Sequence, residues 1–175
     1  KTPSYQKKYN KKAFVITFTH SKHHNNTAYE FFFNSGPLAV LPMHKEKNNS
    51  LSSIVWTNNT DYIENLIQMN DEKIISILNQ KINYKLGSLT KILSKQAFPL
   101  SAHLNSKFYE NRTIYVGDSA HSVHPIAGQG WNLGMRDVEK LFKLSNEYGS
   151  LGINIGGKNF CRKYHNDPFY EAYRL

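Results

Sequence analysis

Residues 117–134 read GDSAHSVHPIAGQGWNLG, and they follow a short apolar run at Arg112–Val116. The run predicts a buried strand, and Gly117 permits a turn that a side chain would obstruct. The small-residue loop Ala127–Gly130 then opens a predicted helix that extends to about Tyr148. A strand, a glycine turn and a helix in this order predict a ligand-binding edge of an α/β domain.

The residue types in this stretch suit a ligand with hydroxyl and amide groups. Asp118 follows the carboxyl end of the predicted strand, where an acceptor carboxylate suits the hydroxyls of a sugar or ribityl chain. The loop lets a ligand lie against the backbone, and its N–H groups join the positive end of the helix. Pro125 stiffens this loop, and the Asn132 side chain can bond an amide edge of a ring. On spacing alone, a purely structural strand-to-helix loop is an equal alternative.

The full pattern, G-D-x-A-H-x-x-H-P-x-A-G-Q-G-x-N-L-G-x-x-D-V, resembles the second flavin motif of the class A FAD-dependent aromatic-ring monooxygenases. It looks most like the branch that hydroxylates intermediates of ubiquinone biosynthesis, and its G-D core is similar to that of the para-hydroxybenzoate hydroxylases. The resemblance implies FAD as the cofactor. The residues that it implies in FAD contact are Gly117, Asp118, Pro125, Ala127, Gly128, Gln129, Gly130, Trp131 and Asn132.

Weaker similarities lie upstream of this motif. Tyr29–Phe32 followed by Gly36–Pro42 resembles a strand pair of that family. Ser53–Trp56 resembles its next strand, and Phe98–Leu100 resembles the segment before its G-D motif. Each is an ordinary strand or turn without the G-D block. The family's N-terminal G-x-G-x-x-G loop and central D-G motif do not occur here, and Trp131 replaces a frequent leucine. We therefore expect a C-terminal fragment of a longer chain.

The rest of the chain alternates short strands with polar turns and then changes to a helical period. The predicted elements are strands at Ala13–His20, Ala28–Phe33, Leu38–Met43 and Leu51–Thr57, a helix after Asn59–Asp61, a helix capped by Asp71, extended structure at Ile92–Leu100, and a helix over Phe160–Tyr173. Tight turns between the first four strands imply an antiparallel meander. In the helix after the motif, Val138, Leu141, Phe142 and Ser145 share one face.

These elements predict an α/β chain with α+β character. Residues 1–105 would form an antiparallel or mixed substrate-side sheet with inserted helices. Residues 106–175 would form the C-terminal part of an FAD-binding domain, including its strand, loop and helix, without the N-terminal G-x-G-x-x-G half. The resemblance implies a para-hydroxybenzoate hydroxylase-like fold.

The histidines invite a metal or an acid–base interpretation. His20, His23 and His24 lie in a polar connection without a carboxylate or cysteine at ligand spacing, so we expect solvated loop histidines and no metal site. His121 and His124 belong to the flavin loop, and we expect them to order it by hydrogen bonds. A catalytic base, with His124 as the candidate, is the alternative.

Composition narrows the partners and the compartment. The 175 residues carry a formal net charge of +9, and the densest basic cluster is Lys7, Lys8, Lys11 and Lys12. A solvated strand end is favoured over a nucleic-acid site, so no nucleic-acid partner is expected.

The single cysteine, Cys161, excludes an internal disulfide, fits a reducing compartment and suits a partly buried structural thiol. Without a signal peptide or an apolar span, we expect a cytoplasmic protein, with peripheral contact at the inner face of the membrane as the alternative.

The resemblance also implies an activity. NADH or NADPH would reduce FAD, dioxygen would form a flavin C4a-hydroperoxide, and its terminal oxygen would pass to an electron-rich ring carbon. An aromatic substrate, such as a polyprenyl phenol of ubiquinone biosynthesis, would lie around Leu41, Pro42 and Trp56. The implied partners are this substrate, O2, and a ubiquinone-biosynthesis complex or a membrane surface that attracts the basic chain. The alternatives are an FAD-dependent oxidoreductase with a different substrate, or a non-catalytic interaction fragment. We expect the chain alone to bind FAD poorly and to be inactive.

Overall fold

The computed structural model describes residues 3–44, 50–123 and 129–166. The chain divides into two compact units. We call Tyr9–Leu100 the sheet unit, and the described residues before and after it the helical unit. Each unit has an apolar cluster of its own, and the two clusters share no residue.

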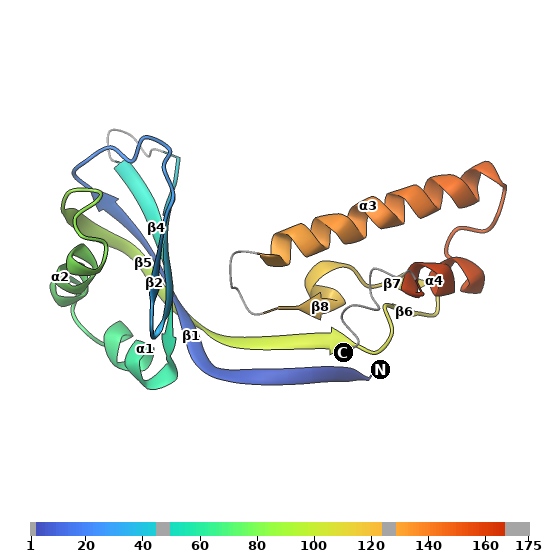
Figure 1. The fold of residues 1–175 in the computed structure, drawn as a ribbon, viewed down its shortest axis with the longest axis horizontal. Helices are drawn as coiled ribbons and strands as arrows, with labels where there is room; N and C mark the ends of the chain where they lie inside the picture. The colour runs from blue at the N-terminus through green and yellow to red at the C-terminus, as the bar shows by residue number, and fades with distance from the viewer. Residues whose placement is uncertain (1–2, 45–49, 124–128, 167–175) are drawn as a thin grey trace. The chain divides into compact units, whose positions relative to one another are not determined.

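The sheet unit is built on a series of antiparallel pairs (Figure 1). It contains β2 (Tyr29–Phe33), β3 (Gly36–Pro42) and β4 (Ser50–Asn59), together with most of β1 (Ser4–His20) and of β5 (Leu89–Asn105). Together with β8 (His121–Ser122) they form a six-stranded sheet in the order β2-β3-β4-β1-β5-β8 among the described residues. The mixed α/β fold and the strands predicted between Ala13 and Leu100 are confirmed. The predicted meander holds for β2 to β4, whereas β1 pairs with β4 and not with β2.

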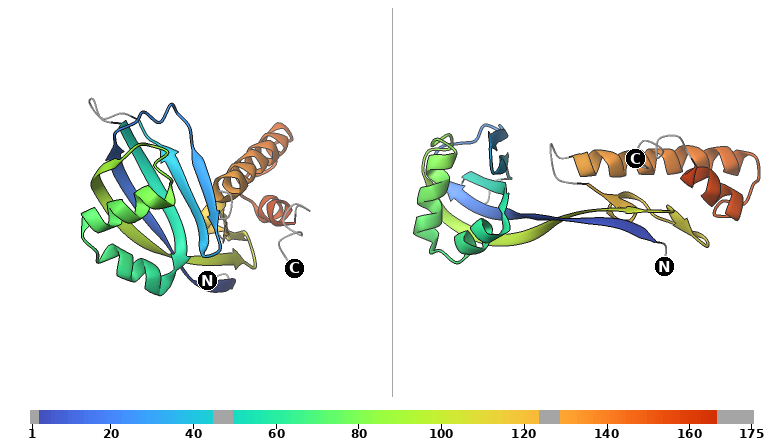
Figure 2. Two further views of the ribbon diagram at one scale, coloured as in Figure 1. Left: turned by 60° about the vertical axis from the view of Figure 1, so that its left-hand side comes forward. Right: turned by 60° about the horizontal axis from the view of Figure 1, so that its bottom comes forward.

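Helices α1 (Thr60–Ile67) and α2 (Asp71–Lys81) cover one face of this sheet (Figure 2). Alternate strand residues such as Phe14 and Ile54 point to that face, because successive side chains of a strand alternate between the two faces. They pack against Ile63 and Leu78 of the helices. This layer forms the larger apolar core.

The start of α2 differs from the prediction. Asp71 is the first helical residue, and the residue before it, Asn70, is the N-cap. The Asn70 side chain accepts a hydrogen bond from the Lys73 backbone N–H at 3.1 Å. Asparagine and aspartate cap helices about equally well, so the sequence pair could not show which one does so here.

The prediction of solvated lysines near the start of β1 holds for two of the four. Lys7 and Lys8 are exposed, and Lys11 and Lys12 are half-buried. The Lys11 ammonium donates to the Ser35 carbonyl at 2.9 Å, and the Lys12 ammonium pairs with Glu64 at 2.5 Å. Ion pairs of this exposed kind stabilise a fold by about 1 kcal/mol or less.

Histidines 20 and 24 are not solvated, which makes that prediction wrong for both. Each is 5% exposed, whereas His23 is exposed. His20 Nδ1 donates to the Lys22 carbonyl at 2.7 Å, and its Nε2 lies 2.9 Å from Ser52 Oγ. A neutral imidazole whose two nitrogens both have partners can be buried at low cost, and polar loop composition does not reveal such partners.

The helical unit contains β6 (Tyr109–Glu110), β7 (Thr113–Ile114), the 3₁₀ turn η1 (Gly117–Ser119), β8, α3 (Gln129–Ser150) and α4 (Lys158–His165). The buried strand predicted at Arg112–Val116 is reduced to β7, which pairs with β6 in a two-stranded ladder. Thr113 is exposed and Ile114 is half-buried. A hairpin partner leaves one edge of β7 unpaired in the described chain, so this strand lacks the burial that its apolar composition suggested.

The face predicted for α3 is also partly wrong. Val138 and Phe142 are 50% and 64% exposed, whereas the residues buried against the unit are Leu133, Asp137 and Leu144. The helix has apolar side chains on two sides, and periodicity alone does not say which side is covered. None of the helices in the described ranges is long and apolar enough to cross a membrane.

The thiol of Cys161 is fully buried in the apolar cluster of the helical unit, as a structural cysteine should be. Its Sγ lies 3.7 Å from the Gly156 carbonyl. Burial raises the pKa of the thiol above its ordinary value. A thiol of this kind is a poor nucleophile, which agrees with the structural role expected from the sequence.

Candidate functional site

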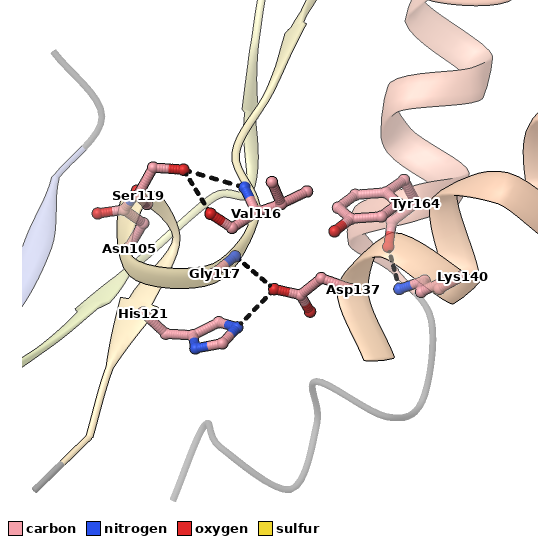
Figure 3. Close-up of polar contacts among 8 residues, drawn as sticks. All are labelled: Asn105, Val116, Gly117, Ser119, His121, Asp137, Lys140 and Tyr164. Carbon is pink, nitrogen blue, oxygen red and sulfur yellow. Dashed lines mark hydrogen bonds and ion pairs between the residues drawn. The ribbon is translucent and has the colours of Figure 1, made fainter. Parts of the chain in front are cut away.

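The predicted ligand-binding turn is η1, in the helical unit (Figure 3). Gly117 has φ +54°, in the left-handed region that favours glycine. A Cβ at Gly117 would lie 3.8 Å from Gly134 Cα, an ordinary contact. Backbone conformation and not lack of space therefore accounts for glycine at 117, and the turn lies beside the second helical turn of α3.

Hydrogen bonds fix the Val116–Gly117 peptide from both ends. The Val116 carbonyl accepts from Ser119 Oγ at 2.7 Å and from the Ser119 backbone N–H at 3.2 Å. The Gly117 N–H donates to Asp137 Oδ2 at 2.7 Å. Asn105 Nδ2 donates to the Ser119 carbonyl at 2.8 Å, which ties the turn to the end of β5. These hydrogen bonds therefore fix the backbone of the turn on either side of Asp118.

The same Asp137 oxygen also receives a side-chain donor. His121 Nε2 lies 2.9 Å from Asp137 Oδ2, and both side chains are buried. The His121 ring meets Phe108 edge-on, with the centroids 6.1 Å apart. This arrangement supports the view that His121 orders the turn by hydrogen bonding.

In contrast, the side chains predicted to meet a ligand are open to solvent. Asp118 and Asn132 are exposed, and Trp131 is 76% exposed. The Asp118 carboxylate makes no hydrogen bond or ion pair with any residue in the described ranges. A free carboxylate on a rigid turn, beside a helix whose first N–H groups carry partial positive charge, is suited to a polyhydroxyl ligand with an electron-rich ring.

A sequence comparison identifies the family. The family described as FAD binding domain matches residues 2–148. The chain belongs to this FAD-binding family. Its resemblance to the class A FAD-dependent monooxygenases is thereby confirmed.

Curated relatives of this chain include ubiquinone hydroxylases. Ubiquinone hydroxylase UbiL of Rhodospirillum rubrum is 31% identical over 156 residues, which are 89% of this chain and 35% of UbiL. Ubiquinone hydroxylase UbiM of Neisseria meningitidis is 28% identical over 167 residues, which are 95% of this chain and 35% of UbiM. The chain therefore spans about a third of the length of these relatives.

Solved structures support the fold. The flavin-dependent halogenase CmlS superposes on 98% of this chain with a TM-score of 0.69. The match covers 31% of the halogenase, and the sequences are 14% identical. At that identity the similarity establishes the fold alone.

The residues of the turn Gly117–Ser119 and of the start of α3 fit FAD chemically. Asp118 offers an acceptor for ribityl hydroxyls, and the start of α3 offers N–H donors. A Cβ added at Gly130 would meet no atom of the described residues within 4 Å, so the backbone at this position is open. Gln129 is exposed and Gly130 half-buried at this helix start. His124, Pro125, Ala127 and Gly128, which were also predicted site residues, lie outside the described residues.

The three residues predicted to contact substrate, all in the sheet unit, do not share one surface. Trp56 is 1% exposed and lies on the helix-covered face, opposite Leu38 in the strand register. Leu41 is 42% exposed and, three residues from Leu38 along β3, points to the other face. Pro42 is half-buried and pairs with Ser52. Leu41 is therefore the one of the three with direct access to a ligand on the open face.

A groove between α3 and α4 lies outside the predicted flavin contacts. Its lining residues are Arg136, Glu139, Lys140, Lys143, Leu144, Glu147 and Lys163. The Lys140 ammonium donates to the Tyr164 carbonyl and lies 4.5 Å from the centre of the Tyr164 ring. This lysine therefore joins the two helices. In the described chain, no group of three His, Cys, Asp or Glu side chains has a geometry suited to a metal ion.

The residue that sequence reasoning missed is Asp137. The quoted motif contains it, but no role was assigned to it. The signal was present: Leu133, Leu141 and Leu144 have helical spacing, and Asp137 occupies the same stripe. A buried carboxylate within an apolar stripe must have hydrogen-bond partners, and here these are Gly117 in the turn and His121 just after it.

Proposed function

We propose that the chain supplies the ring-facing part of the FAD site in a flavin-dependent aromatic-ring hydroxylase. The observation that carries the proposal is the turn at Gly117–Ser119. It presents the exposed Asp118 carboxylate, is hydrogen-bonded to α3 through Asp137, and lies within a chain of the FAD-binding family. Residues 1–105 would then provide the substrate-side sheet, and residues 106–175 the C-terminal part of the FAD-binding domain.

Each exposed residue has a distinct binding role in this proposal. The Asp118 carboxylate accepts hydrogen bonds from the ribityl hydroxyls. The first N–H groups of α3, beginning at Gln129 and Gly130, stabilise negative charge at the electron-rich edge of the ring. The Asn132 side chain bonds the amide edge, and the Trp131 indole excludes water from a face of the ring. The chain itself needs no nucleophile for this chemistry.

FAD, once reduced by NADH or NADPH, supplies the activation of dioxygen and the transfer of one oxygen atom to an electron-rich ring carbon. The substrate class that we propose is a polyprenyl phenol. The support is that UbiL and UbiM, which match 89% and 95% of this chain, are named ubiquinone hydroxylases. Leu41, on the open face of the sheet, is the residue of this chain that would contact the apolar substrate. A ubiquinone-biosynthesis complex or a membrane surface would deliver that substrate.

FAD titration tests the cofactor site. The 175-residue chain and the complete gene product are each titrated with FAD, and binding is followed by visible absorbance and flavin fluorescence. We expect tighter binding by the complete product, since the relatives are much longer than this chain. Asp118→Asn should weaken binding about tenfold, the loss expected for a charge-assisted hydrogen bond. Asp61→Asn, at an exposed aspartate of the sheet unit, is the matched control and should change nothing.

A colourless complete product with added FAD would contradict the proposal and favour a non-catalytic interaction module.

The substrate class needs its own measurement. Turnover of NADH or NADPH and dioxygen is compared for a polyprenyl phenol and for small soluble phenols. A product formed only from the small phenols would replace the ubiquinone assignment with the second candidate, an FAD-dependent oxidoreductase with another substrate.

A further inference from the structure

Asp137 is a carboxylate in an unusual place. It is 1% exposed and lies on the face of α3 that also buries Leu133 and Leu144. Burial of an unpaired carboxylate costs several kcal/mol, so such a residue is stable only where donors surround it. The donors that surround Asp137 identify what it does.

Two of these donors come from the two ends of the same short segment. The Gly117 N–H, at the start of η1, and His121 Nε2, just after it, both lie within 2.9 Å of Asp137 Oδ2. Between them in the sequence lies Asp118. One oxygen atom of α3 therefore fixes both ends of the turn that carries the predicted ribityl acceptor (Figure 3).

The bond to Gly117 has a directional effect. The Val116 carbonyl is fixed by Ser119, so the Gly117 N–H of the same peptide needs an acceptor on the opposite side. Asp137 is that acceptor. With the peptide plane fixed at both ends, and with φ +54° at Gly117, the direction in which the chain enters Asp118 is determined.

We propose that Asp137, together with His121, is a positioning residue that presents the Asp118 carboxylate to the ribityl chain of FAD. The inference rests on the proposed function and deepens it. Asp137 itself does not touch the cofactor. Its effect on FAD binding passes through the geometry of the turn, so it depends on the presence of the Asp118 carboxylate.

The first test needs no cofactor. Proton–nitrogen NMR of the 175-residue chain measures the Gly117 amide, which should be downfield and slow to exchange because it donates to a buried carboxylate. Asp137→Ala should move this signal and speed its exchange. Asp137→Asn keeps an acceptor oxygen of similar shape and should largely retain it. Glu139→Gln, at an exposed residue two positions further along α3 that pairs with Lys143, is the matched control.

The second test is a double-mutant cycle for FAD affinity in the complete gene product. Asp137→Ala should weaken FAD binding about tenfold in the wild-type background, and Asp137→Asn should restore most of that loss. In an Asp118→Asn background, Asp137→Ala should have little further effect, because the carboxylate that it positions is gone. Amides of the helical-unit core, such as that of Phe160, report whether the fold of that unit is intact.

The outcomes separate the two proposals. If the wild-type product binds no FAD, the proposed function fails, and an unperturbed Gly117 amide in Asp137→Ala then overturns the positioning role as well. If FAD binds and the losses from Asp118→Asn and Asp137→Ala simply add, the positioning role is wrong while the flavin site stands. If the Gly117 amide changes and the two losses are non-additive, Asp137 acts through Asp118.

Discussion

His20 is a buried residue whose ionisation is coupled to the stability of the sheet unit. Its two nitrogens contact the Lys22 carbonyl and the Ser52 hydroxyl, and the rings of His24 and Phe18 lie 6.0 and 5.7 Å away, centre to centre. Burial lowers the pKa of His20 below its ordinary value of 6.5, the neighbouring histidines lower it further, and the carbonyl bond acts in the opposite direction. The folded chain therefore favours the neutral ring.

This leads to a pH dependence of defined sign. Because the pKa of His20 is lower in the folded state than in the unfolded state, folding releases protons as the pH falls below 6.5. The stabilisation from neutral His20 is complete above that pH and is lost below it. We expect the thermal midpoint to fall between pH 7 and pH 5.5. His20→Gln should flatten this dependence and His44→Gln, at an exposed ring, should not. A wild-type midpoint that rises over this interval would contradict the assignment.

At the residue scale, the sequence allowed us to predict which side chain could bind a ligand. It did not allow us to predict which residues hydrogen-bond to one another. The sequence indicated Asp118 as a free acceptor because its neighbours form a glycine turn at a helix start. It could not indicate that Asp137 bonds the Gly117 N–H, because that bond joins residues twenty positions apart. The burial of His20 depends in the same way on Ser52, a residue of another strand.

Among the elements, α3 shows why periodicity is an incomplete guide. Trp131, Met135, Val138 and Phe142 recur at helical spacing and are all exposed, whereas Leu133 and Leu144 pack against the unit. In a helix with two apolar faces, helical periodicity identifies both faces equally well. Only the elements that pack against the helix determine which face is buried. Strands β2 to β4 were easier to predict, because the alternation of apolar and polar residues determines which side chains face the covered side of the sheet.

The hairpin between β2 and β3 depends on one glycine. Gly36 has φ +145°, and a Cβ there would lie 2.4 Å from the Thr57 carbonyl oxygen of β4. Gly36→Ala should therefore lower the free energy of unfolding by roughly 2 kcal/mol or more, through backbone strain and overlap. Ser35→Ala in the same turn is the control and should cost about 0.5 kcal/mol or less. Urea unfolding of the two variants measures both effects, and equal losses would show that the contact is not restrictive.

For the molecule as a whole, charge is the property that most constrains its partners. The formal net charge is +9, and Lys7 and Lys8 are exposed on β1. A chain of this charge is attracted to an anionic surface by a force that salt screens over about 10 Å at 0.1 M. The same charge gives no sequence specificity, so it does not by itself indicate a nucleic-acid ligand.

Vesicle sedimentation tests the membrane contact. We expect binding to vesicles that contain phosphatidylglycerol at low salt, release at about 0.5 M salt, and weak binding to phosphatidylcholine alone. The Lys7→Glu, Lys8→Glu double variant should bind the anionic vesicles less tightly. Binding that ignores both salt and lipid charge would exclude electrostatic attraction and indicate insertion of apolar side chains.

The two tryptophans give the molecule a built-in optical readout. Trp56 is 1% exposed in the sheet unit, and Trp131 is 76% exposed at the start of α3 in the helical unit. The buried indole should emit at a shorter wavelength, and a soluble quencher such as iodide should reach only the exposed one. One emission spectrum thus carries two signals. The short-wavelength emission of Trp56 reports the unfolding of the sheet. The long-wavelength emission of Trp131, which iodide can quench, should decrease when a flavin binds beside α3.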